Sequence, residues 1–445
     1  MIEKNKEYIV NIEDMTYEGM GVAKIDNFPI FIESAITGEK IKIKIVKVLK
    51  NFAYGKVMEI IEKSLDRIEP FCPMYKRCGG CNIQHMSYDA TLKLKKNIVQ
   101  NNLKRIAGLD IEVEDVKGMT EPYNYRNKAQ YPVGIQNNEV VVGFYSAGSH
   151  NIVPNMECGI QSKFSGEVIK AVKEYIIDNR ISVYNEETKK GVIRHVVIRN
   201  SEKTGESMLI VVINSSKKLE GIKEYLNSKK INISTIVQNI NMKNTNVILG
   251  EKNIVLSGKG YITDMIGNLR FKISPHSFFQ VNKTQTEVLY NTALEMAGLT
   301  GNEVVYDLYC GTGTISLFLA QKAKKVYGVE IVAPAIENAK ENAIENDIQN
   351  VEFICGKSEE VIFDIKDTPD TVVVDPPRAG CDVKLIKEIC RLGPEKMVYV
   401  SCNPATLARD IKEFEGYEVK KVVPVDMFCW SNHVETVVLL QNEKL

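Results

Sequence analysis

The sequence has no long apolar run and no excess of charge of either sign. No apolar stretch approaches the roughly 18 residues that cross a membrane, and the opening Met-Ile-Glu-Lys-Asn-Lys lacks the apolar core of a signal peptide. Basic and acidic residues both number 57, which argues against a general polyanion-binding protein. Internal repeats and low-complexity tracts are absent as well. These absences predict a cytoplasmic globular protein without membrane contact, and 445 residues predict two or three domains.

Two basic stretches interrupt this neutral balance. Such stretches are either solvated faces of a strand pair and a helix, or surfaces suited to phosphate contacts. The first spans residues 40 to 56 and contains six lysines and no acid. The second lies between Asp89 and Asp110 and contains Lys93, Lys95, Lys96, Lys104 and Arg105.

Hydrophobic periodicity divides the chain into three parts. Residues 1 to 61 read as five short alternating strands with glycine turns, which predicts a small β-barrel of the OB type. Residues 62 to 272 mix strands and helices, so a central α+β domain is expected, with a helix over 92–107 that can pack on the third domain. Residues 273 to 445 repeat strand, glycine turn and helix, which predicts an α/β domain with a doubly wound, Rossmann-like parallel sheet.

A glycine loop in the third domain indicates an adenosine-containing cofactor. The segment Asp307-Leu308-Tyr309-Cys310-Gly311-Thr312-Gly313 follows a buried strand, and Glu330 ends the next strand about 20 positions later, where an acid can hold ribose hydroxyls. The loop is not G-x-G-x-x-G, and no Gly-Lys-Ser/Thr follows it. The pattern therefore disfavours dinucleotides and nucleoside triphosphates and favours S-adenosylmethionine.

Two later loops carry groups suited to methyl transfer onto a pyrimidine carbon. Asp375 opens Asp-Pro-Pro-Arg after the fourth strand, and Cys402 precedes a probable helix start, where the helix N-terminus is expected to favour thiolate. A thiolate that adds to carbon 6 of uracil makes carbon 5 nucleophilic, and a base must then remove the carbon 5 proton. Glu435, at the start of the last strand, is the candidate base. On their own, Cys402 could equally be a packing residue and Glu435 a surface acid.

In this order the motifs resemble those of the 5-methyluridine RNA methyltransferases, over nearly the whole chain. The matching pieces also include Ser277-Phe278-Phe279-Gln280-Val281-Asn282 and His433-Val434-Glu435. The resemblance implies Cys402 as the nucleophile and Glu435 as the proton acceptor. It further implies an S-adenosylmethionine site formed by Gln280, Tyr309, Gly311, Glu330 and Asp375.

Four of the ten cysteines form a separate pattern, Cys72, Cys78, Cys81 and Cys158. Four thiolates can hold either zinc or an iron–sulfur cluster, and the spacing does not decide between them. The family resemblance implies a [4Fe–4S] cluster in the central domain and identifies residues 1 to 61 as a TRAM module. Family members that act on ribosomal RNA carry both features, and members that act only on transfer RNA typically lack them. The resemblance therefore implies RNA, most specifically 23S ribosomal RNA, as the substrate. The sequence carries no signal for the oligomeric state, and a monomer is expected because it suits a large RNA partner.

Other activities fit parts of the same pattern. A transfer RNA uridine or cytosine carbon 5 methyltransferase would use similar chemistry, although cytosine enzymes usually place a cysteine elsewhere and lack the late His-Val-Glu strand. Asp-Pro-Pro alone also suits amine methyltransferases, which need no Cys402. A non-catalytic RNA-binding or assembly protein would use the barrel and the cysteines but would not need Cys402.

Overall fold

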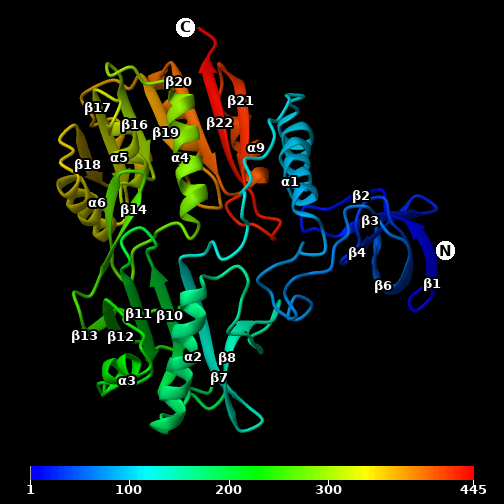
Figure 1. Cartoon of the computed structure of the whole chain (residues 1–445). Coiled ribbons are helices and arrows are strands. Elements are labelled where there is room, and N and C mark those ends of the chain that lie inside the picture. The colour runs from blue at the N-terminus through cyan, green and yellow to red at the C-terminus, as the bar shows by residue number, and fades with distance from the viewer. Residues whose placement is uncertain (1, 445) are drawn as a thin grey trace.

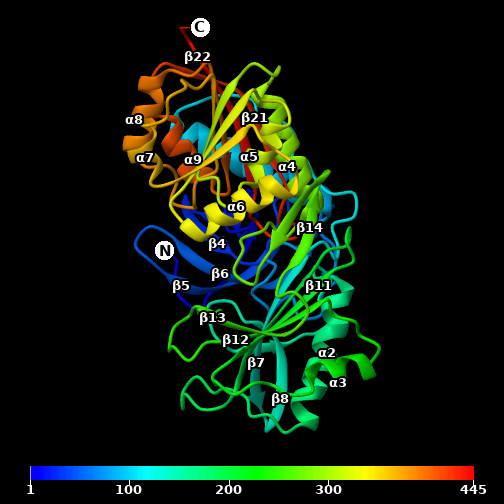
Figure 2. The same cartoon turned by 90° about the vertical axis from the view of Figure 1, so that its left-hand side faces the viewer.

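The protein consists of three sheet-based units, which the computed structural model describes for residues 2–444. In Figure 1 the N-terminal barrel lies to one side, the central sheet lies below, and the C-terminal sheet lies above it. Figure 2, turned by 90°, again shows the C-terminal sheet above the central sheet, and in this view the barrel strands β4, β5 and β6 appear at a height between the two. No helix among residues 2–444 is long and apolar enough to cross a membrane.

The N-terminal unit is a six-stranded sheet in the order β1-β5-β6-β4-β3-β2, in which every neighbouring pair is antiparallel except β4 with β6. Along β5 the isoleucines at 41, 43 and 45 are buried, and the lysines between them face outward. The sequence predicted five strands here, and the sixth is the two-residue β2, which is too short to give an alternating pattern. The strands are β1 (Glu7–Asn11), β2 (Asp14–Met15), β3 (Gly21–Ile25), β4 (Phe28–Ile32), β5 (Lys40–Val48) and β6 (Ala53–Glu62).

The central unit is a seven-stranded sheet in the order β13-β12-β11-β10-β7-β8-β9. Helices α2 (Lys163–Asp178) and α3 (Ile222–Ser228) contribute Val168, Ile169 and Leu226 to the core on one face of this sheet. The cysteine-rich stretch from 63 to 87 precedes this sheet and contains no named helix or strand. The strands are β7 (Lys128–Gln136), β8 (Glu139–Tyr145), β9 (Ile152–Pro154), β10 (Ile193–Asn200), β11 (Ser207–Ile213), β12 (Thr235–Ile240) and β13 (Lys252–Ser257).

The C-terminal sheet has the order β18-β17-β16-β19-β20-β22-β21, with five parallel strands followed by an antiparallel pair. Chain order reverses on either side of β16, and ligands of doubly wound sheets bind beyond the carboxyl ends of strands at such a point. The expected doubly wound sheet is thus confirmed. Its strands are β16 (Val304–Leu308), β17 (Lys325–Glu330), β18 (Val351–Cys355), β19 (Thr371–Val374), β20 (Lys396–Ser401), β21 (Tyr417–Val425) and β22 (Glu435–Asn442).

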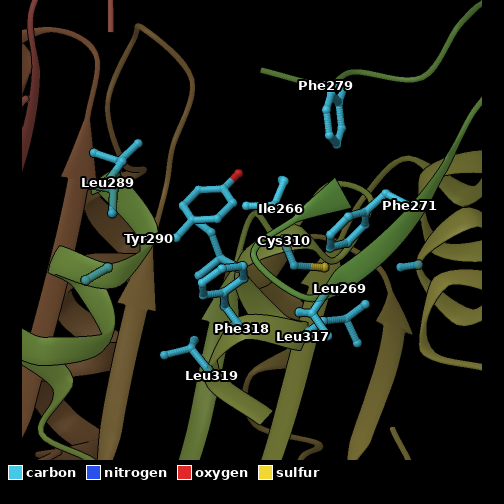
Figure 3. Close-up of a cluster of buried hydrophobic side chains, with 14 of the residues drawn as sticks. Ile266, Leu269, Phe271, Phe279, Leu289, Tyr290, Cys310, Leu317, Phe318 and Leu319 are labelled. Atoms are coloured by element: carbon cyan, nitrogen blue, oxygen red, sulfur yellow. The ribbon is translucent and has the colours of Figure 1, made fainter. Parts of the chain in front are cut away.

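Helices cover both faces of this sheet. One face carries α4 (Lys283–Ala297), α5 (Thr314–Ala320) and α6 (Ala333–Glu345), and Figure 3 shows side chains of this core, including Leu289, Tyr290 and Phe318. The hairpin of β14 (Ile262–Ile266) and β15 (Leu269–Ile273) packs into the same core. The same core contains Val197, Ile210 and Val237 of the central sheet, so it includes residues that precede position 273 and joins the two units.

The opposite face carries α7 (Ser358–Val361), α8 (Val383–Leu392), α9 (Pro404–Ile411) and also α1 (Tyr88–Asn102). Helix α1 ends in a π-helical turn, Leu103–Ala107, and lies against β21 and α9, far from its own sequence neighbours in the central sheet. An early segment of the chain is therefore part of the C-terminal core.

The basic stretches are less open than the sequence suggested. Lys95 is fully buried and forms an ion pair with Asp426, so it is not available for phosphate. Lys96 pairs with Asp115 at 2.7 Å, and Lys42 pairs with Glu7 at 2.8 Å. Acids from neighbouring elements reach these lysines in space, which a count along the sequence cannot detect.

Candidate active site

A cavity of about 1390 Å³ opens beyond the carboxyl ends of the parallel strands. Its walls come from the loops after β16, β17, β19 and β20, from the start of β22, and from the segment that precedes α4. The fold brings together all seven residues that the sequence analysis assigned to catalysis and cofactor binding. These are Gln280, Tyr309, Gly311, Glu330, Asp375, Cys402 and Glu435.

The glycine loop is bound to the end of the next strand through Glu330. The Gly311 N–H donates to Glu330 Oε2 at 3.2 Å, and the Val332 N–H donates to Oε1 at 2.9 Å. Gly311 has a φ of +56°, and no atom lies within 4 Å of the position that a Cβ would take, so its backbone is open to a ligand. Tyr309 adopts a φ of +67°, a conformation that non-glycine residues rarely hold outside functional loops. Glu330 therefore fixes the loop and still lines the cavity.

Strand register places Cys402 beside Glu435. In the antiparallel pair of β20 and β22, Ser401 lies opposite Thr436. One step further along the same register, Cys402 follows the end of β20 and Glu435 begins β22, and both line the cavity. A thiol and a carboxyl from positions 33 residues apart in the sequence (435 − 402) are thereby held at one end of a strand pair.

The loops that carry Asp375 and Cys402 are bound to each other. Asn403 caps α9 by accepting from the Ala405 N–H at 3.1 Å. The same side chain donates to the Arg378 carbonyl at 3.2 Å, and Thr406 Oγ1 donates to that carbonyl at 3.3 Å. Two side chains of α9 and its cap therefore set the position of the Asp-Pro-Pro-Arg loop.

Burial raises the pKa values of two carboxyls and of the reactive thiol in this site. It raises the pKa of Asp375 to about 7. Burial, and then the charge of Asp375, raise the pKa of Glu435 to about 8. Burial and the carboxylates of Glu435 and Asp375 raise the pKa of the Cys402 thiol to about 11. A raised carboxyl pKa makes Glu435 a stronger base than an exposed glutamate.

The expectation that the helix N-terminus lowers the Cys402 pKa was wrong. The thiol lies ahead of a short helix in a partly apolar cavity, and desolvation with two nearby acids outweighs the helix dipole. The positive charge of Arg378 acts in the opposite direction and lowers the pKa of both Cys402 and Glu435. Arg378 is the last residue of the Asp-Pro-Pro-Arg motif, but no pattern in the sequence indicates this effect on the two pKa values.

Gln280 and its neighbours join the cavity to the central unit. Asn127 Nδ2 donates to the Gln280 carbonyl at 3.0 Å, and Arg199 Nη2 donates to the Ser277 carbonyl at 2.7 Å. Arg199 is 5% exposed, and Arg194 is similarly buried and bonds to the Asn241 carbonyl. Both arginines therefore hold backbone carbonyls inside the protein and are not free for contacts with a ligand.

The four cysteines of the 72–158 pattern line a second cavity of about 290 Å³. The Gly80 N–H donates to Cys78 Sγ at 3.4 Å, and Asn155 Nδ2 lies 3.9 Å from Cys72 Sγ. Burial raises the pKa of Cys81 to about 12 and also raises the pKa values of Cys78 and Cys158. Buried thiols of this kind stay protonated unless a cation binds among them.

Within residues 2–444, no three His, Cys, Asp or Glu side chains are grouped closely enough to hold a single metal ion. The four sulfur ligands of a tetrahedral zinc each lie about 2.3 Å from the metal, so they are grouped more closely than the four cysteines around this cavity. The cysteines thus share a cavity but not the tight grouping of a mononuclear site.

Comparisons with known proteins agree with this site. A family model described as tRNA (uracil-5-)-methyltransferase matches residues 87–443, and a TRAM domain model matches residues 3–58. Two curated relatives are described as uncharacterised RNA methyltransferases. The protein from Clostridium tetani is 50% identical, with 99% of this chain and 97% of the relative covered. The protein from Clostridium acetobutylicum is 51% identical, with 99% and 98% covered.

A solved structure resembles the chain over nearly its whole length. It is the Pyrococcus abyssi tRNA (uracil-54, C5)-methyltransferase in complex with S-adenosyl-L-homocysteine. The TM-score is 0.80 at 29% identity, with 97% of this chain and all of that chain covered. The likeness therefore extends through the N-terminal barrel and the cysteine region as well as the C-terminal sheet.

Proposed function

The chain belongs to the RNA (uracil-5-)-methyltransferase family and depends on S-adenosylmethionine, and on that premise we propose that it methylates carbon 5 of a uridine in structured RNA through a covalent Cys402 adduct. The observation that carries this proposal is the register of β20 and β22, which holds Cys402 and Glu435 side by side in the cavity. Glu330 and Asp375 line the same cavity, so a methyl donor and a base can meet there.

The chemistry assigns one step to each side chain. Cys402 Sγ adds to carbon 6 of uracil, and the displaced electron pair makes carbon 5 enolate-like. S-adenosylmethionine supplies the methyl group that carbon 5 takes up. Glu435 then accepts the carbon 5 proton, the carbon 5–carbon 6 double bond re-forms, and the thiolate leaves carbon 6. Because the Cys402 pKa is about 11, Arg378 has a supporting role in stabilising the thiolate.

We assign the methyl donor to the wall formed by Gln280, Tyr309, Gly311, Glu330 and Asp375. The Glu330 carboxylate suits ribose hydroxyls, and the open backbone of Gly311 allows close approach. All of these residues and both reacting side chains come from one chain, which supports a monomeric enzyme. Its site of action would be the cytoplasm.

The RNA class has two candidates. The combination of a TRAM module with four cysteines favours 23S ribosomal RNA, following the family resemblance. Transfer RNA is the second candidate, because the Pyrococcus abyssi structure that covers 97% of this chain is of an enzyme named for uracil 54 of tRNA. The barrel and the cysteine region lie within that matched length, so they do not by themselves separate the two substrates.

For the four cysteines we propose a [4Fe–4S] cluster. The ligands of a cluster bind different iron atoms and stand further apart than those of one zinc ion, which fits four thiols around one cavity without a tight group. The N–H group directed at Cys78 Sγ is the kind of contact that stabilises cluster sulfurs. Binding of iron to the four sulfur atoms would also stabilise their thiolate forms and so counteract the effect of burial, which raises the pKa values of these thiols.

The deciding experiment is tritium release from carbon-5-tritiated uridine in unmodified ribosomal and transfer RNA, tested separately. Wild type should release tritium in the presence of S-adenosylmethionine, and Cys402→Ala should not. Cys390→Ala is the matched control, because Cys390 lies on the outer helix α8 and does not line the cavity.

Each outcome is informative. Release only from ribosomal RNA supports the first substrate, and release only from transfer RNA supports the second with the same mechanism. Equal release by Cys402→Ala would contradict the covalent route, and no release from either RNA by folded, cofactor-binding wild type would contradict the uridine carbon 5 assignment.

A further inference from the structure

One loop of the C-terminal sheet connects the four-cysteine cavity with the catalytic cavity. It spans residues 426 to 432, between the end of β21 and the segment that leads to Glu435. Phe428, in this loop, lines the catalytic cavity. Trp430, two positions later, is the only tryptophan of the chain and is 1% exposed. The loop therefore places the side chain of Phe428 in the catalytic cavity and the side chain of Trp430 in a separate hydrophobic core.

Trp430 packs directly with the cysteine region. Its core also contains Cys81 and Cys158, with Phe71 next to Cys72. The rings of Trp430 and Phe71 are 5.3 Å apart, and Trp430 Nε1 donates to the Pro122 carbonyl at 2.8 Å. Any change in the spacing of these cysteines is therefore transmitted to the indole by van der Waals contact.

The backbone of the loop is held by the same region. The N–H groups of Asn82 and Ile83, directly after Cys81, donate to the Trp430 carbonyl at 3.2 and 3.3 Å. Trp430 adopts a φ of +66°, which a non-glycine residue keeps only where its surroundings hold it. Asn82 and Asn432 also bond reciprocally, at 2.7 and 2.9 Å. Contacts from outside the C-terminal sheet therefore add to the hydrogen bonds that the loop makes within itself, such as the Ser431 N–H to the Phe428 carbonyl.

The other end of the loop is fixed beneath the catalytic cavity. Lys95 of α1 forms a buried ion pair with Asp426 and donates to the Phe428 carbonyl at 3.0 Å. Asn282, which follows the Gln280 motif, donates to the Met427 carbonyl at 3.1 Å. A shift at Trp430 would thus be passed to Phe428 and to the start of β22, because the residues between them have few free torsions.

From these contacts we infer that Trp430 is a positioning residue that couples the four-cysteine site to the placement of Phe428 and Glu435. The inference rests on the proposed function for the roles of Glu435 and of the cysteines. A filled cysteine site holds Phe71, Asn82 and Ile83 against Trp430, and the loop in turn holds the catalytic base. Coupling is reciprocal, so a change at Trp430 must also alter how firmly the cysteine site keeps its metal.

The test uses the protein as purified, with metal content measured by elemental analysis and metal loss followed in excess chelator. Trp430→Ala should hold the metal on the order of tenfold more weakly than wild type, which lies in the usual range of such couplings. It should therefore retain less metal than wild type when both are equilibrated with the same chelator. Trp430→Phe keeps an aromatic ring against Phe71 and should restore retention to near the wild-type level. Phe414→Ala is the matched control, since it removes a buried ring of the same domain that contacts neither cavity.

The emission of the single tryptophan gives a second readout that needs no catalysis. Removal of metal from wild type should change Trp430 emission, and kcat should fall more than KM rises when methylation is then assayed. Equal metal loss from Trp430→Ala and Phe414→Ala would overturn the inference, as would unchanged emission on metal removal or purified protein that holds no metal. These results are independent of tritium release by Cys402→Ala, so failure of the proposed function would be recognised separately.

Discussion

The buried carboxyl of Glu435 should make the folded protein less stable as the pH rises. Glu435 is 5% exposed, and burial and Asp375 raise its pKa from 4.5 to about 8. Below pH 4.5 the carboxyl is protonated in both the folded and the unfolded chain, so it has no differential effect. Between about 4.5 and 8 the unfolded chain ionises while the folded chain stays protonated, and the free energy of unfolding falls over that window.

The size of the effect follows from the shift. A difference of about 3.5 pKa units at about 1.36 kcal/mol each gives an upper limit of roughly 5 kcal/mol above pH 8. The same linkage gives roughly 3 kcal/mol at pH 7 and less than about 1 kcal/mol at pH 5. Glu435→Gln keeps the volume and removes the ionisation, so the variant should gain stability over wild type by these amounts.

Denaturant unfolding at pH 5 and pH 8, followed by Trp430 emission, measures this difference in the C-terminal unit. The informative quantity is the change in the variant-minus-wild-type free energy of unfolding between the two pH values, because groups that are not coupled to Glu435 cancel in that difference. Glu418→Gln is the matched control, because it makes the same substitution at an exposed glutamate on the neighbouring strand β21. If the free energy of unfolding differs between Glu435→Gln and wild type by the same amount at pH 5 and pH 8, the conclusion that burial raises the pKa of this carboxyl is wrong.

Three further outcomes follow from the same contacts. Glu435→Gln should accumulate a covalent RNA–protein adduct, visible as a slowly migrating band on denaturing gels, because nothing then removes the carbon 5 proton. If no adduct forms with an RNA that wild type methylates, another residue must be the base. The wild-type rate of tritium release should rise with pH through about 8, since Glu435 must be ionised to act as a base and its pKa is about 8, and a rate that falls over this range would contradict that role. Lys95→Met should lower the free energy of unfolding by about 3–5 kcal/mol, since it leaves the buried Asp426 carboxylate without its cationic partner, with only the Tyr88 hydroxyl still donating to it. Lys96→Met, at an exposed pair, should change it by less than about 1 kcal/mol.

The sequence alone was sufficient for the parts of the protein that depend on local order. Strand, glycine turn and helix in alternation predicted the doubly wound sheet, and the alternating isoleucines of residues 41–45 predicted a barrel strand. The methyltransferase family and the TRAM module also followed from motifs in their order, and the family and domain models agree. The assignments of Cys402 and Glu435 and of the cysteine metal remain predictions for the experiments above.

Only the tertiary structure decided the features that depend on distant contacts. Lys95 meets Asp426 inside the protein, although 331 positions separate them (426 − 95). The Cys402 pKa is raised and not lowered, because desolvation depends on what surrounds the thiol and not on the helix that follows it. The role of the 426–432 loop had no sequence signal, since its shape is set by contacts with Phe71, Asn82 and Lys95. Local pattern fixes which elements form, whereas burial and pairing of charge depend on which elements meet.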